Sequence, residues 1–162
     1  MPKASVSGRR GLDLSRYMSG LYLVDAMALA YRSFYALLRT DMRAPSGLPT
    51  TAVYGFAQAL IRVAEIRDVS HMAIVRDLPG PTFRHKMYPE YKANRLKAPE
   101  DLLAQLPWIA ELTALFGIPH VSEEGLEADD LIAAFVMHAR KTGEEVRILS
   151  GDKDLMQLVD ER

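Results

Sequence analysis

The sequence predicts an α/β fold in which a mostly parallel β-sheet is covered by helices on both faces. Short apolar runs of the kind found in buried strands alternate with segments whose apolar residues have helical spacing, and the runs lie at 21–24, 72–75, 118–121 and 146–149. Such alternation is typical of right-handed βαβ units, which make the strands parallel. With 162 residues and 49% hydrophobic composition, the chain is long enough for one domain of this kind.

The first half of the chain is expected to contain two strands and two helices. The strand at 21–24 leads into a helix over 26–38, in which small and apolar residues recur at helical spacing. A loop rich in proline and glycine follows, and a second helix covers 51–66. The strand at 72–75 comes next. This order predicts the first βαβ unit.

The second half begins with a segment, 78–98, that is rich in basic and aromatic residues and has no steady period. A helix is expected over 99–117, because it starts with a proline and two acids that favour a first turn. Pro107 predicts a kink within it. After the short third strand, a helix over 127–141 and the strand at 146–149 complete the pattern.

Composition excludes several classes of protein. The chain has no cysteine, which rules out disulfides, a thiolate nucleophile and cysteine-bound metals. Its formal net charge of −1 shows no overall basic excess. No apolar run approaches the roughly 18 residues of a membrane span, so we expect no membrane partner and a cytoplasmic location. Residues 1–20 lack the apolar core of a signal peptide, and we expect them to form a flexible tail.

Acidic residues follow the predicted strand ends, where ligands bind in open parallel sheets. These acids are Asp25, Asp77, Glu127, Asp129, Asp130, Asp152 and Asp154. If the strands are neighbours, the carboxylates converge on one edge and repel one another unless cations neutralise them. Oxygen donors without cysteine or paired histidines favour Mg²⁺ or Mn²⁺. Two such ions about 4 Å apart would support phosphodiester hydrolysis.

Each acid also has a purely structural explanation. Asp25 or Asp77 taken alone is a typical N-cap of the next helix. The acids at 127–130 suit the positive end of a helix dipole, and Asp152 could cap a short helix after it. Their common position at successive strand ends favours the metal-binding interpretation over these alternatives.

Basic and aromatic residues interleave within 83–97. Basic side chains bind phosphates without reading sequence, and aromatic rings stack on unpaired bases with about 1–3 kcal/mol each. Arg84, Lys86 and Tyr91 are therefore candidate DNA contacts, although an ordinary solvated loop would have a similar composition. Small residues around Gly55 would either approach a DNA backbone or allow tight helix packing.

Five motifs occur in order along 21–160, namely LVD (23–25), TFR (82–84), YKANR (91–95), GLEADD (125–130) and SGDKD (150–154). In this order they resemble the 5′-3′ exonuclease (flap endonuclease) domain of bacterial DNA polymerase I. The resemblance implies a PIN-like 5′ nuclease fold for 21–162, with 78–98 as a segment like the helical arch. It also implies a structure-selective 5′ nuclease of replication and repair, which cleaves 5′ flaps, 5′ ends and RNA primers and is joined to a polymerase domain in the parent chain.

The resemblance assigns roles to individual residues. The acids around the first of two Mg²⁺ (or Mn²⁺) ions are matched by Asp25, Asp77, Glu127 and Asp129, and those toward the second ion by Asp130, Asp152 and Asp154. Lys92 and Arg95 match cations that lie on a helix over the metals and stabilise charge on the reacting phosphate. Preorganised cations of this kind commonly contribute a few kcal/mol to a barrier.

Two departures from the family pattern are visible. Arg76 precedes Asp77 where the family usually has phenylalanine, and we expect it to compete with metal or to form an ion pair with Asp77. The family also continues past the last motif into further acids and a helix-hairpin-helix, which we expect to be missing from these 162 residues. Two other functions therefore remain open: a PIN-like ribonuclease, against which the long basic segment counts, and a catalytically silent module that binds nucleic acid.

Overall fold

A four-stranded parallel sheet forms the centre of the computed structural model, which describes residues 20–65, 69–94 and 96–160. Its strands are β1 (Leu21–Asp25), β2 (His71–Val75), β3 (His120–Val121) and β4 (Val146–Leu149), in the order β3-β2-β1-β4. All three strand pairings are parallel. The predicted parallel sheet is confirmed, with a third strand shorter than expected.

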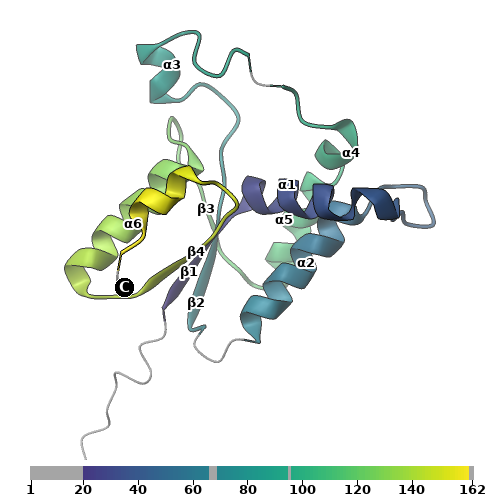
Figure 1. The fold of residues 1–162 in the computed structure, drawn as a ribbon, viewed down its shortest axis with the longest axis horizontal. Coiled ribbons are helices and arrows are strands. Elements are labelled where there is room, and N and C mark those ends of the chain that lie inside the picture. Colours follow the sequence, from purple (N-terminus) through teal and green to yellow (C-terminus); the bar gives the residue numbers. More distant parts are fainter. Residues whose placement is uncertain (1–19, 66–68, 95, 161–162) are drawn as a thin grey trace, which may run out of the picture.

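Helices cover both faces of this sheet (Figure 1). One face carries α1 (Ala26–Leu37), α2 (Thr51–Ala64), α4 (Glu100–Leu103) and α5 (Leu106–Leu115), and the other carries α6 (Ala128–Thr142). The short helix α3 (Phe83–Met87) and the 3-10 turns η2 (Leu38–Thr40) and η3 (Asp154–Leu158) complete the helical elements that the structure describes. Within these described residues, no helix is long and apolar enough to cross a membrane.

The central strand β1 explains why the sheet is covered twice. Val24 packs with Leu29, Phe56 and Ile109 in the core under α1, α2 and α5, whereas its neighbour Leu23 packs in the core under α6. Successive side chains of a strand point to opposite faces, so a run that is apolar at every position needs a cover on each side. The predicted tail, 1–20, lies outside the described residues except for its last position.

The predicted helix over 99–117 is wrong in one respect, because the structure contains two helices there, α4 and α5. Pro107 lies in the first turn of α5, where its missing N–H removes no helical hydrogen bond, so it begins a helix and does not kink one. Between the helices, the fully buried Gln105 accepts hydrogen bonds from the backbone N–H groups of Ala52 and Val53 at 2.7 and 3.2 Å. The break therefore places a side-chain cap on the start of α2.

Gly55 lies where α1 and α2 pack together. A Cβ atom added at Gly55 would lie 2.7 Å from the Cβ of Ser33 on α1, closer than real Cβ atoms approach. Tight helix packing thus accounts for this glycine, and a DNA contact at Gly55 stays a prediction.

We expect Gly55→Ala to lower the free energy of unfolding, because the added methyl group forces the two helices apart. Overpacking of this kind costs about 1–3 kcal/mol, and the better helix propensity of alanine offsets about 1 kcal/mol. Urea unfolding measures the net loss. The matched control is Gly151→Ala, where an added Cβ meets nothing within 4 Å. Equal stability of the two variants would contradict the packing argument.

Candidate functional site

The carboxyl edge of the sheet has a crevice between β1 and β4. From β1 the chain moves to β2 and β3 on one side, and then crosses to β4 on the other side of β1. The loops that leave β1 and β4 therefore diverge, which is the arrangement that creates ligand sites in open α/β sheets. Asp25 ends β1 at this point, and the loop containing Asp152 follows β4.

A cleft of about 1050 Å³ occupies this edge. Five of the predicted acids line it, namely Asp25, Asp77, Glu127, Asp129 and Asp152. Cationic side chains line it as well, namely Arg32, Lys92, Lys97 and Lys153. The cleft therefore joins a group of carboxylates to a group of cations.

Asp25 is fixed on the central strand with only 5% of its surface exposed. Its Oδ1 accepts the backbone N–H of Ala28 at 3.0 Å, and its Oδ2 accepts the hydroxyl of Ser150 at 2.8 Å. The N-cap explanation is thus correct for Asp25, and the same two bonds hold its carboxylate at the floor of the cleft.

Asp77 caps a helix other than the one that follows it. Its Oδ1 accepts the backbone N–H of Ala128, the first residue of α6, at 2.8 Å. Arg76 is exposed, and the ion pairs of the described residues include none between Arg76 and Asp77. Of the two effects expected of Arg76, the ion pair with Asp77 is therefore not formed, because Asp77 turns toward the α6 backbone, and competition with metal stays a prediction.

The pKa of Asp129 is raised by its burial and by its position among the other acids of the cleft. Burial, followed by the negative charges of Asp25, Asp152 and Asp77, raises the pKa of Asp129 to about 6. The charges of three neighbouring carboxylates thus add to the effect of burial, because these four acids lie near one another at the cleft. The structure thus brings together acids from the ends of β1 and β2, the start of α6 and the loop after β4.

These pKa shifts make the free energy of unfolding depend on pH. Because the folded-state pKa of Asp129 is raised, the folded chain binds this proton more tightly than the unfolded chain, and the contribution of Asp129 to stability is expected to rise as pH falls from about 7 toward 5. Burial and then the charge of Arg76 lower the pKa of His120, and its contribution changes in the opposite direction as pH falls through the ordinary histidine range. The pKa of Asp130 is lowered, chiefly by its hydrogen bonds to Arg84, so its contribution is present above the unfolded pKa and is lost in stronger acid. Melting temperature against pH, in the absence of metal, measures these contributions together. Asp129→Asn should remove the rise; a rise of the same size in this variant would contradict the assignment.

Glu127 is the most heavily contacted acid of the cleft. It is 8% exposed and forms the N-cap of α6. Lys92 Nζ donates to its Oε1 at 2.8 Å, and Tyr91 Oη donates to its Oε2 at 3.1 Å. Arg84 Nη1 lies 3.3 Å from the same Oε2. Glu127 therefore holds the basic segment against the first turn of α6.

Asp130 and Arg84 are paired with each other. The two Nη atoms of Arg84 donate to the two carboxylate oxygens of Asp130, both at 2.7 Å. Asp130 also accepts the backbone N–H of Glu127 at 2.9 Å. Neither residue lines the cleft. The structure thus places the predicted ligand Asp130 and the predicted DNA contact Arg84 in a bidentate ion pair beside the site, and not within it.

The remaining predicted residues are exposed where the structure describes them. Asp152 lines the cleft, and its Oδ1 accepts the backbone N–H of Asp154 at 2.9 Å, whereas Asp154 does not line the cleft. Lys86 lies on the exposed surface of α3. Arg95 lies outside the described residues.

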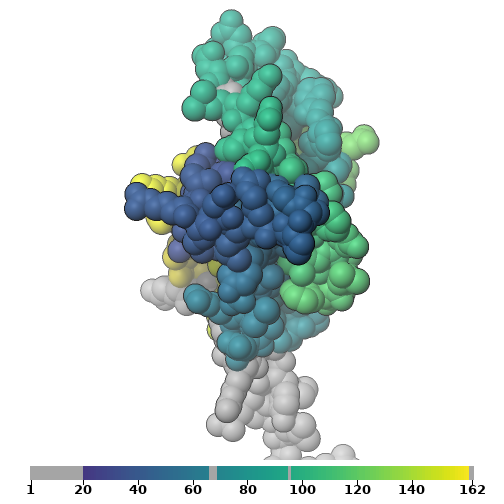
Figure 2. Space-filling model, turned by 90° about the vertical axis from the view of Figure 1, so that its right-hand side faces the viewer, coloured from purple at the N-terminus to yellow at the C-terminus, as the bar shows by residue number. Residues whose placement is uncertain are grey.

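The basic segment, whose sequence has no steady period and was expected to resemble the helical arch, contains the helix α3 followed by turns. Figure 1 shows the chain rising from β2 to α3 and crossing above the carboxyl edge to α4, and in Figure 2 this segment projects beyond α1. Lys92 lies in a turn, where the resemblance had implied a helix, and its φ of 60° is left-handed. The basic segment thus follows an arch-like course over the site, but Lys92 lies in a turn and not in a helix.

The donors at the cleft fit divalent cations by their chemistry. All the acids that line it offer hard oxygen atoms, and their repulsion is the condition that a bound cation relieves. In the present side-chain conformations, the described residues contain no group of three His, Cys, Asp or Glu side chains close enough to hold one ion. Hydrogen bonds to Lys92, Ser150 and the backbone hold the carboxylates apart, so binding of an ion requires them to turn inward.

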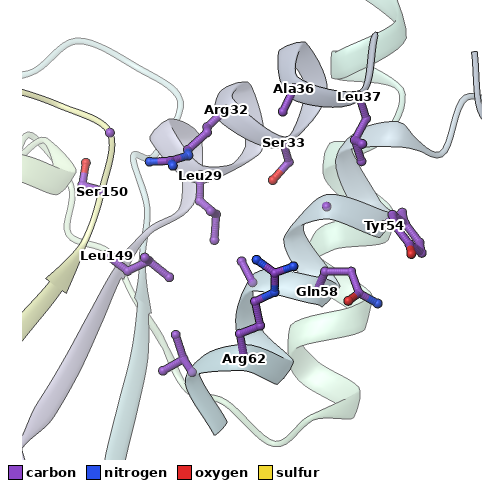
Figure 3. A pocket seen from close by; sticks show the side chains of 14 residues that line it. Leu29, Arg32, Ser33, Ala36, Leu37, Tyr54, Gln58, Arg62, Leu149 and Ser150 are labelled. Atoms are coloured by element: carbon purple, nitrogen blue, oxygen red, sulfur yellow. The ribbon is translucent and has the colours of Figure 1, made fainter. Parts of the chain in front are cut away.

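A second hollow, of about 480 Å³, lies between α1 and α2 and shares Arg32 and Gly151 with the cleft. Figure 3 shows Arg62 and Gln58 extending into it from α2, and Arg32 extending from α1 on the side of Ser150. Sequence reasoning missed Arg32 as a lining residue, although its helical spacing, two turns after Asp25 on α1, is a signal that could have found it. Lys97 belongs to the predicted basic segment but was not singled out as a site residue.

The chain is similar to a known family and to known polymerases. Residues 20–162 match the family model described as "5′-3′ exonuclease, N-terminal resolvase-like domain". The chain is 43% identical over 144 residues to DNA polymerase I of Bacillus subtilis, covering 88% of this chain and 16% of the relative. It is 44% identical over 140 residues to the thermostable DNA polymerase I of Thermus aquaticus, covering 86% and 16%. The chain thus spans about a sixth of the length of these relatives.

Two solved structures share the fold. A T5 5′-exonuclease with bound zinc ions superposes with a TM-score of 0.67 at 22% identity, covering 87% of this chain and 52% of that one. A T5 flap endonuclease in a pseudo-enzyme-product complex with DNA and metal ions superposes with a TM-score of 0.61, also at 22% identity, covering the same shares of both chains. The likeness extends over nearly all of the sheet and its helices.

Proposed function

The chain belongs to the family of 5′-3′ exonuclease N-terminal resolvase-like domains, and from this premise we propose that it acts as a structure-selective 5′ nuclease. Its substrates are 5′ flaps, 5′ ends and RNA primers, and it hydrolyses their phosphodiester bonds with two Mg²⁺ or Mn²⁺ ions. The predicted family and the predicted 5′ nuclease fold are confirmed by the family model and by the superposed T5 structures.

One observation supports the proposed chemistry above the others. Carboxylates from four separate elements lie near one another at the carboxyl edge, and the turn carrying Lys92 is held against the same edge. This combination is what a phosphodiester nuclease requires, because anionic ligands hold the metal ions and a cation meets the charge that develops on the phosphate.

In this proposal Asp25, Asp77, Asp129 and Asp152 hold the metal ions, with Glu127 beside them. The ions, when bound, supply the Lewis acid and the activated water of a two-metal site. Asp25 is positioned at the floor of the site by the hydroxyl of Ser150 and the α1 backbone. Asp130 and Asp154 have a weaker claim as ligands, because neither faces the cleft.

The cations of the cleft bind the substrate in this proposal. Lys92 stabilises the reacting phosphate, with Arg95 in the same role by resemblance. Arg32 and Lys97 line the cleft and contact neighbouring phosphates. Tyr31 and Tyr35, whose rings are stacked with centroids 6.3 Å apart, line it too and offer faces for unpaired bases.

The parent protein supplies a polymerase domain in this proposal. The relatives are DNA polymerase I chains, of which the chain spans 15–16%. We propose that this nuclease portion works in the cytoplasm on DNA ends and primer junctions that the polymerase generates during replication and repair.

Cleavage of a 5′-labelled flap duplex by the 162-residue chain tests the proposal. We expect cleavage in Mg²⁺ and in Mn²⁺, and none with a chelator, because the carboxylates alone cannot activate water. A chain that stays folded and binds the duplex in either metal without cutting it would favour the silent nucleic-acid-binding module. The observation that supports this alternative is that Asp130 and Asp154 do not line the cleft.

A further inference from the structure

Glu127 has two possible partners that exclude each other. Its carboxylate is 10% exposed at the cleft, where the proposed function places a divalent cation, and Lys92 Nζ already contacts its Oε1 at 2.8 Å. An ammonium group and a divalent cation on one carboxylate repel each other and use the same oxygen lone pairs. Tyr91 and Arg84 contact the other oxygen, Oε2, so Oε1 is the atom for which competition is expected.

The turn that carries Lys92 is held to α6 by this contact. Lys92 has a φ of 60°, a left-handed conformation that costs free energy for a residue with a Cβ. Two backbone hydrogen bonds of the turn are local, from Tyr91 N–H to the Tyr88 carbonyl and from Ala93 N–H to the Glu90 carbonyl. Lys92, Ala93 and Asn94 are exposed. Tyr91, at the start of the same turn, is half-buried and adds two contacts, an edge-to-face contact with the ring of His85 (centroids 5.3 Å apart) and its hydrogen bond to Glu127 Oε2. Both oxygens of Glu127 therefore help to position the turn, and the Lys92 contact is the one made to Oε1.

The attachment of α3 involves a second acid, Asp130, although Arg84 Nη1 also lies 3.3 Å from Glu127 Oε2. Arg84 at the start of α3 is fixed to Asp130 by the bidentate ion pair, away from the cleft, and its guanidinium lies 4.6 Å from the ring centroid of Phe83. A cation that binds in the cleft leaves this pair in place. The Lys92 contact thus lies on an acid that lines the cleft, whereas the Arg84–Asp130 pair lies on an acid outside it.

We propose that a divalent cation and Lys92 compete for Glu127, so that metal binding detaches the Lys92 turn while the Arg84–Asp130 pair keeps α3 anchored. This inference rests on the proposed function, because it needs a cation in the cleft. Its consequence is an order of events: without metal, Lys92 neutralises a metal ligand, and with metal, its ammonium group becomes available to a substrate phosphate.

The competition has a reciprocal consequence. If metal and Lys92 exclude each other on Glu127, removal of the Lys92 charge tightens metal binding by a factor set by the stability of the Lys92–Glu127 contact in the metal-free chain. Lys92→Met keeps the length of the side chain and removes the ammonium group. Coupling between sites commonly amounts to about 5- to 150-fold, and we expect the variant to bind Mn²⁺ at least about fivefold more tightly than the unmodified chain.

Lys97→Met is the matched control. Lys97 also lines the cleft and is exposed, and the Glu127 contacts within the described part of the chain involve Tyr91, Lys92 and Arg84 instead. Its removal changes the charge of the cleft by the same amount, so it measures the general electrostatic effect. We expect its Mn²⁺ affinity to change by about twofold or less, because an exposed and screened charge acts weakly at a distance.

Calorimetric titration of the three proteins with Mn²⁺ tests the competition, and amide hydrogen exchange of the unmodified chain tests the detachment. In Mg²⁺ we expect faster exchange at 88–94, unchanged exchange at 83–87, and slower exchange at the start of α6. Equal Mn²⁺ affinities of Lys92→Met and Lys97→Met, or unchanged exchange at 88–94 while α6 is protected, would overturn the inference. No binding of Mn²⁺ and no protection of α6 in any protein would remove the proposed metal site itself, and the inference with it.

Discussion

Asp25→Asn is expected to reduce cleavage of a 5′-flap duplex by at least about a hundredfold, in line with the loss of one preorganised electrostatic contact in an enzyme site. Asp25 lies on the central strand, 5% exposed, with one oxygen on the α1 backbone and the other on Ser150. Asparagine has nearly the same shape and still offers an oxygen to the α1 backbone. The substitution therefore removes the negative charge and leaves the cap largely intact. Single-turnover cleavage in saturating Mg²⁺ measures the effect.

The control for Asp25→Asn removes a carboxylate elsewhere. Glu111 is exposed on α5, outside the residues that line the cleft, and Glu111→Gln is expected to cleave at the unmodified rate. Melting temperatures of both variants show whether either change acts through folding. A folded Asp25→Asn protein that cleaves within about threefold of the unmodified chain would exclude this carboxylate from the metal site.

Lys92→Ala is expected to lower turnover at least tenfold at saturating metal, which corresponds to about 1.4 kcal/mol of lost transition-state stabilisation. Lys92 contacts the acidic cluster through Glu127, and its charge also lowers the pKa of Asp129 across the cleft. Substrate affinity should fall less than turnover, because the cation is needed most when charge develops on the phosphate. Single-turnover rates over a range of DNA concentrations separate the two.

The directions in which turnover and metal affinity change distinguish a phosphate-stabilising cation from a residue that holds the metal. Loss of a ligand weakens metal binding and lowers turnover together, whereas loss of the Lys92 ammonium group should lower turnover and tighten metal binding. The control is Lys141→Ala, an exposed lysine in the last turn of α6, for which neither quantity should change. Unchanged turnover of Lys92→Ala in a chain that cleaves DNA would contradict the assignment.

The predicted sheet and most of the predicted helices are confirmed because their signals are local. Leu23 and Val24 are adjacent and both apolar, which only a strand covered on two faces requires, and the structure buries them in separate cores. The acids after the strands were found for the same reason. A residue at the end of a parallel strand or just after it lies near the carboxyl edge, so the amino-acid order was enough to place Asp25, Asp77 and Asp152 near one another.

Contacts between segments far apart in the sequence could not be predicted from local sequence patterns. Arg84 and Asp130 are 46 positions apart, and either residue alone is typical of a DNA contact or a metal ligand, yet each is the other's partner. Gln105 caps α2 through the backbone N–H of Ala52, 53 positions before it, so a continuous helix over 99–117 was the wrong prediction. Local patterns thus determined the layers of the fold and the edge at which the acids lie. Which acids face the cleft, and which are held by cations beside it, was decided by tertiary packing, because the orientation of a side chain depends on partners that only the folded chain brings within hydrogen-bonding distance.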